Sequence, residues 1–136
     1  MAKRITKWMW VKALRDDQKA AITQRCERFI RDELKPRFLP QIQPTEFNYP
    51  VDIFGKWRGS QYSFIQRWRS GFAAKLGDEF NAAFTRLDHR DDCFDEIRFD
   101  VMWHRHTGQW FCLYVFLTLE EALERIRTDE LLQPLQ

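Results

Sequence analysis

The stretch Phe99–Phe116 reads FDVMWHRHTGQWFCLYVF, and it decides the fold that the sequence predicts. Its two halves have the side-chain alternation and the aromatic and β-branched residues that are typical of strands. Thr107 and Gly108 lie near its middle, and glycine supplies the positive φ that a two-residue hairpin turn requires. We therefore predict a β-hairpin with Thr107-Gly108 at its tip.

The register of this hairpin assigns its side chains to two faces. With a two-residue loop, one almost wholly apolar face should lie against the core, and it consists of Phe99, Val101, Trp103, Arg105, Trp110, Cys112, Tyr114 and Phe116. The other face is half apolar and consists of Asp100, Met102, His104, His106, Gln109, Phe111, Leu113 and Val115. A strand that is apolar on both faces is usually covered on both. A four-residue loop over 105–108 is the alternative, and a slip of one residue would exchange the two faces.

Length and composition indicate a single globular domain, residues 1–136. The chain is long enough to bury a core without disulfides or metal ions, and its aromatic content of 15% is high. A net charge of +2 argues against nucleic-acid binding through bulk charge, although a local basic patch can form. Cys26, Cys93 and Cys112 are an odd number and widely spaced, which fits a reducing compartment. No stretch approaches the roughly 20 apolar residues of a membrane span, so we expect a soluble, cytoplasmic protein.

A helix is predicted over residues 17–35. Asp16 or Asp17 can cap it, because a carboxylate there accepts hydrogen bonds from unpaired backbone N–H groups. Pro36 is expected to end it, because the residue before a proline is pushed out of the helical region. The apolar stripe of this helix consists of Ile22, Cys26, Phe29, Ile30 and Leu34.

The remaining elements are predicted from turn signals, alternation and capping. They are a hairpin over 49–69 that turns at Arg58-Gly59, a strand over 80–87, and a helix over 118–128 that begins with the capping box Thr118 and Glu121. In the predicted register Tyr62 lies opposite Gly55 and can cover the bare glycine backbone. The fold class we expect is α+β, with an N-terminal helix, an antiparallel meander of about four or five strands, and a C-terminal helix.

The second face and the tip of the first hairpin form the leading candidate site. Met102, His104, His106 and Phe111 share that face. Arg105 opposite Trp110 would form a cation–π pair at the tip. The excess of aromatic residues favours a non-catalytic binding or interaction module. The doubly apolar strand would suit a protein partner or a homodimer formed through the sheet.

A basic sheet face is the second candidate site. Lys56, Arg67 and Arg69 share one face of the hairpin over 49–69, and an aromatic residue lies among them. Cations interleaved with aromatic side chains are the pattern that binds single-stranded nucleic acid. The basic, tryptophan-containing arm over residues 1–15 would add to such a surface, bind a membrane surface or an acidic partner, or dock on the body of the fold.

A metal site is the third candidate. His89, Cys93, His104 and His106 provide nitrogen and sulfur donors in the number that tetrahedral zinc prefers. Their spacing is not that of the familiar zinc motifs, so no cofactor is expected from the pattern alone. The chain contains no nucleophile elbow, phosphate-binding glycine loop or HExxH motif. An enzymatic function is therefore not favoured.

Overall fold

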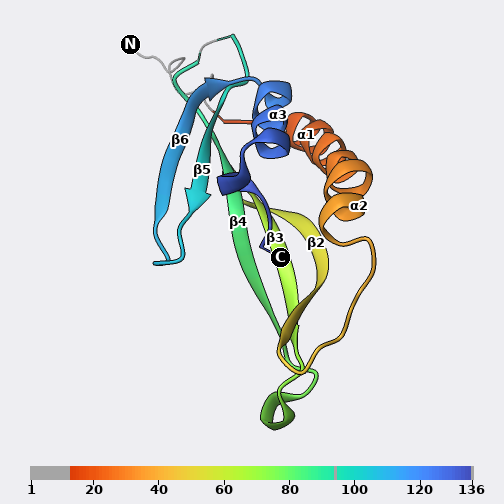
Figure 1. Ribbon diagram of the computed structural model, residues 1–136. Coiled ribbons are helices and arrows are strands. Elements are labelled where there is room, and N and C mark those ends of the chain that lie inside the picture. Colours follow the sequence, from red (N-terminus) through yellow and green to blue (C-terminus); the bar gives the residue numbers. More distant parts are fainter. Residues whose placement is uncertain (1–12, 94, 136) are drawn as a thin grey trace.

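The computed structural model describes residues 13–93 and 95–135, so the candidate basic arm lies largely outside the described residues (Figure 1). The fold is α+β, as predicted. In chain order the elements are α1 (Asp16–Phe29), η1 (Ile30–Leu34), α2 (Lys35–Phe38), β2 (Asn48–Arg58), β3 (Gln61–Ser70), η2 (Ala73–Lys75), β4 (Glu79–His89), β5 (Phe99–His104), β6 (Trp110–Leu117), α3 (Leu119–Thr128) and η3 (Glu130–Leu132). The strands form one antiparallel sheet in the order β2-β3-β4-β5-β6. No helix within the described ranges is long and apolar enough to cross a membrane.

All the longer helices lie on one face of this sheet (Figure 1). The predicted stripe of α1 and η1 is buried there against strand residues that include Tyr62, Phe64 and Leu87. Burial raises the pKa of the Cys26 thiol to about 12, so Cys26 is a packing residue and not a nucleophile. The Arg25 guanidinium bonds the Glu120 carboxylate at 2.8 Å and links α1 to α3 across the surface of the core.

The prediction that Pro36 ends the first helix is wrong. The helix continues to Phe38, and Lys35 keeps helical φ and ψ of −63° and −44°. The reason is the π-turn η1, in which the Lys35 N–H donates to the carbonyl of Ile30, five residues back. This extra residue per turn shifts the bonding pattern, and Pro36 falls in the first turn of α2, where its missing N–H costs little.

The capping prediction is also wrong at the start of α1 and is confirmed at the start of α3. Asp16 and Asp17 are already helical, and the N-cap is Arg15, whose N–H donates to the Gln18 side chain at 2.9 Å. At α3, Thr118 is the N-cap, its hydroxyl accepts the Glu121 N–H, and the Glu121 carboxylate accepts the Thr118 N–H.

The β2–β3 hairpin turns one residue later than predicted. Arg58 pairs with Gln61, so Gly59, with φ of +61°, and Ser60 form the turn. Gly55 consequently lies opposite Phe64 and not opposite Tyr62. The predicted cover of the glycine still forms, because the Tyr62 ring leans over Gly55 from a neighbouring position.

The β5–β6 hairpin turns through a longer loop than either predicted register allows. His104 pairs with Trp110, and residues 105–109 form the loop, which is closed by the Arg105 N–H on the Gln109 carbonyl at 2.9 Å. This slip moves Trp110 and Cys112 to the face away from the helices, and it moves Phe111 to the helix side, beside Trp103. An irregularity between Met102 and Val101 absorbs the slip, and Val101 lies opposite Tyr114, as predicted.

Candidate functional site

The β5–β6 hairpin runs beside β4 for only half the length of β4. Pairing between β4 and β5 extends from Thr85 to His89, opposite Trp103 to Phe99. Beyond Thr85 the hairpin turns away from the sheet, and within the described ranges the edge of Glu79–Phe84 that faces it has no strand partner (Figure 1). The divergence opens a cleft between β4 and the hairpin tip.

The C-terminal tail forms the third wall of this cleft. The Thr85 hydroxyl donates to the Leu132 carbonyl at 2.7 Å. The buried Gln66 amide donates to the Leu135 carbonyl at 2.7 Å and accepts the Leu135 N–H at 3.2 Å. These bonds hold the tail across the helix-side face of β3 and β4, next to the cleft.

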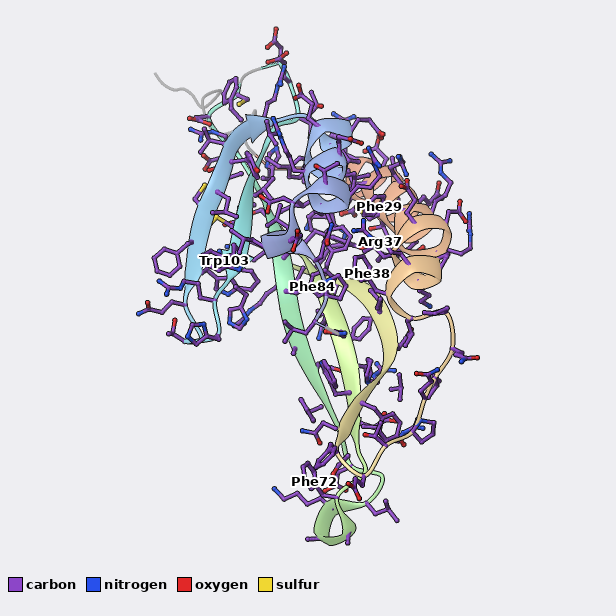
Figure 2. The ribbon with its side chains drawn as sticks, viewed as in Figure 1. Phe29, Arg37, Phe38, Phe72, Phe84 and Trp103 are labelled. Atoms are coloured by element: carbon purple, nitrogen blue, oxygen red, sulfur yellow. The ribbon has the colours of Figure 1, made fainter. Side chains whose placement is uncertain are left out.

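A cavity of about 380 Å³ lies between these three walls. Its lining is mainly apolar and comes from β3, β4, the hairpin and the tail: Gln66, Ala82, Ala83, Phe84, Trp103, His104, Arg105, His106, Gly108, Glu130, Leu131, Gln133 and Leu135. Three consecutive residues of β4 contribute to it, and the last of them, Phe84, lies at an irregularity of the β3–β4 ladder. The cavity reaches the edge of β4, because the His104 side chain in its lining contacts the Ala83 carbonyl on that edge. Figure 2 labels two of the lining residues, Phe84 on β4 and Trp103 on β5.

Arg105 is the cation of this cavity. Its guanidinium carbon lies 5.6 Å from the centroid of Trp103 and 5.1 Å from that of Phe111. Its Nε is buried and has no hydrogen-bond partner, and no acidic side chain of the described residues forms an ion pair with it. Burying a charged donor without an acceptor costs free energy. An anion bound in the cavity would meet this charge, because Arg105 is part of the lining.

The predicted histidines have different surroundings. His104 ends β5, and its Nδ1 is 3.0 Å from the Ala83 carbonyl oxygen, across the point where the two strands separate. Its ring lies 4.6 Å from that of Trp110, over which the Arg86 guanidinium also lies at 4.6 Å. His106 is exposed in the turn and lines the mouth of the cavity.

The structure divides the leading candidate site between the two faces of the sheet. Met102 pairs with Cys112, and His104 pairs with Trp110, on the face away from the helices. Phe111 instead lies beneath the Arg105 guanidinium on the helix side, so the expected Arg105–Trp110 pair is replaced by Arg105 over Phe111 and Trp103. Of the predicted residues, Arg105, His104 and His106 line the cavity.

The candidate basic face carries acids beside its arginines. Arg67 lies 3.8 Å from the Asp52 carboxylate and stacks over Phe54 at 4.7 Å. Arg69 bonds Glu79 at 2.7 Å. Lys56 is exposed on the same face. These ion pairs reduce the positive potential that a phosphate backbone would meet.

The four candidate zinc ligands are not brought together. His89 pairs with Phe99, whereas His104 lies at the other end of β5, about 16 Å away at strand rise. The Cys93 thiol donates to Asp92 at 3.8 Å. Burial lowers the pKa of His89. Among residues 13–93 and 95–135, no group of three or more His, Cys, Asp and Glu side chains could hold a metal ion.

Sequence reasoning missed most of the cavity lining. Phe84 was expected in a strand, but nothing in the sequence shows that this part of β4 lacks a neighbour. Leu131 and Leu135 lie in a tail without periodicity, and Gln66 was not distinguished from the polar residues around it. The one available signal was Gln66 at a core position of an alternating strand, because a buried amide needs partners.

The fold defines a small α+β domain with an apolar, arginine-containing cleft, and its sequence places it in a family. Residues 14–133 match the family model described as "Domain of unknown function (DUF3024)". Because this match covers nearly the whole chain, the protein belongs to that family. Comparison with curated proteins and comparison with solved structures give no match.

Proposed function

We propose that this domain is a non-catalytic binding module and that its ligand site is the cavity between β4, the β5–β6 hairpin and the C-terminal tail. The observation that carries the proposal is Arg105, a partly buried guanidinium that lines a mainly apolar cavity and forms no ion pair with an acidic side chain of the described residues. The cavity volume of about 380 Å³ is in the range of small-ligand sites.

The chemistry of the lining favours an amphipathic anion. Apolar side chains such as Phe84, Trp103 and Leu131 would take up an apolar group, and Arg105 would bond a carboxylate or another oxyanion. Glu130 is the acidic side chain of the lining, and it opposes anion binding. The cavity holds no nucleophile and base at bonding distance, which is why we propose binding and not catalysis.

The fluorescent anion 8-anilinonaphthalene-1-sulfonate tests this proposal, because it joins an aromatic body to one negative charge. We expect it to bind the folded protein and Arg105→Met to weaken binding at least tenfold, since a hydrogen bond to a charged group contributes about 1.5–3 kcal/mol. Arg58→Met is the matched control, because Arg58 is exposed at the end of β2 and is not part of the cavity lining. Equal binding by both variants would remove the proposal.

Self-association through the sheet is a second candidate function. Strand β6 is an edge strand, and Phe111, Val115 and Phe116 on it are 39%, 58% and 46% exposed. Exposed apolar side chains on an edge strand favour pairing with another strand. Sedimentation equilibrium should then give a mass near twice 16.6 kDa, and Val115→Lys should return it to that of the monomer. A monomer at high concentration would exclude this candidate.

A further inference from the structure

The unpaired part of β4 presents backbone hydrogen-bonding groups along an edge that leads to the cavity, which begins at Ala82. The Ala83 carbonyl points toward the hairpin, since His104 reaches it. The N–H and C=O of one residue in an antiparallel strand point to the same side, and alternate residues repeat this direction. The N–H and C=O of Asn81 and Glu79 therefore face the same open edge. The intervening residues face β3 instead, as the backbone carbonyl of Asp78 shows by accepting the Ser70 N–H at 2.8 Å. This edge can accept one more strand.

An added strand on this edge must end at the cavity. From Thr85 onward the edge is already occupied by β5, and His104 covers the Ala83 carbonyl. A strand that runs from Glu79 toward Ala83 meets the end of β5 and then Arg105, the next residue, which lines the cavity together with Ala82 and Ala83. The terminus placed there is an amino group if the strand is antiparallel to β4 and a carboxylate if it is parallel. The positive charge of Arg105, which forms no ion pair with an acidic side chain of the described residues, favours the carboxylate.

We propose that the cleft binds the C-terminal segment of an extended peptide as a short strand parallel to β4. Asn81 and Glu79 pair with the peptide backbone, Arg105 bonds its terminal carboxylate, and the last side chain enters the apolar space between Phe84 and Trp103. Main-chain bonds give affinity in this binding mode, and the end pocket gives specificity for a free chain end. The proposal rests on the proposed function and names the ligand class of the same site.

The first test compares two peptides on the unmodified protein. The probes are an N-acetylated hexapeptide of alternating threonine and valine that ends in valine, as the free acid, and the same peptide as its C-terminal amide. Calorimetric titration should show at least tenfold weaker binding of the amide, because the amide removes the charge that Arg105 meets. Glu130→Gln should tighten binding of the free acid, because it removes the acidic side chain from the lining. Equal affinities for acid and amide would overturn the carboxylate assignment.

The second test examines the backbone pairing. Two peptides are compared, one N-methylated at its odd residues and the other at its even residues. Methylation of the residues whose N–H groups face β4 should abolish binding, and methylation of the other set should change it little. Asn81→Pro removes a donor on the open edge, where proline is tolerated, and should weaken the peptide without changing 8-anilinonaphthalene-1-sulfonate binding. If both methylated peptides bind like the parent peptide, the added strand is refuted.

The tests separate the two proposals and exclude another occupant. If the fluorescent anion responds to Arg105→Met and neither peptide binds, the peptide inference fails while the binding site stands. If the anion does not respond, the proposed function itself fails. If the protein is a dimer that Asn81→Pro makes monomeric, a second copy occupies this edge, and the peptide inference is overturned.

Discussion

Replacing Gly55 by alanine should destabilise the protein, although this change usually stabilises a strand. The usual gain is about 0.4–1 kcal/mol, because alanine restricts the unfolded chain. Here a Cβ on Gly55 would lie 1.9 Å from the Tyr62 hydroxyl oxygen and 2.2 Å from its Cζ. To reach ordinary contact at 3.4 Å, the Tyr62 ring would have to move by 3.4 minus 1.9, or about 1.5 Å.

The ring has no room for such a movement. Tyr62 is 1% exposed, and its ring packs edge-on against Trp57 at 5.2 Å and Phe64 at 5.4 Å. Overpacking of a filled core costs about 1–3 kcal/mol, and we expect the upper end of this range for Gly55→Ala. For a domain of this size that is a fall in Tm of about 10 °C.

Urea denaturation followed by tryptophan fluorescence measures the effect, and two further variants identify its cause. Gly59→Asn is the control, because Gly59 has φ of +61°, which asparagine tolerates, and no atom lies within 4 Å of its Cβ position. Tyr62→Phe removes the nearest clashing atom and should reduce the cost of Gly55→Ala. If Gly55→Ala lowers the free energy of unfolding no more than Gly59→Asn does, the Tyr62 ring does not pack over Gly55 as described.

Three other predictions concern single contacts. His89 is partly buried against Phe99, and burial lowers its pKa, so the unfolded chain binds the proton more readily. Stability should therefore fall as pH drops below the ordinary histidine pKa of about 6.5. His89→Phe should remove that part of the pH dependence of the urea midpoint. Thr118→Ala should cost about 1 kcal/mol in the same assay, with no loss if the capping bond is unimportant. Gln66→Leu should speed amide exchange at Leu135, measured by hydrogen–deuterium exchange, and unchanged exchange would show that the side chain does not hold the tail.

The local sequence pattern correctly predicted those features of the helices that depend only on residues close together in the chain. The apolar stripe that includes Ile22 and Phe29 is buried, and the capping box at Thr118 forms, because both depend on neighbours within a few residues. The predicted end of the first helix was wrong, because the prediction did not include the π-turn or the tertiary contacts of the helix. A π-turn places Pro36 where a proline fits, and the burial of Leu34 beside it stabilises the continued helix.

Hairpin registers were predicted less well, because a turn signal fixes a bend but not the number of residues in it. Gly108 does adopt positive φ, at +86°, yet the loop around it is longer than the signal suggested. That difference moved Trp110 to one face and Phe111 to the other. Val101 and Tyr114 still face each other, because an irregularity in the ladder restores the register where the core requires it.

The sequence alone therefore determined the fold class, the antiparallel meander and the two helical stripes, since hydrophobic periodicity and turn chemistry are local properties. The cleft was decided only in the tertiary structure. It exists because β5 leaves β4 after Thr85 and because Gln66 and Thr85 hold the tail beside the gap. These contacts join residues far apart in the chain, and no local pattern records them. The same packing places Arg105 in the lining of the cleft without an acidic partner among the described residues, and the proposed function depends on that feature.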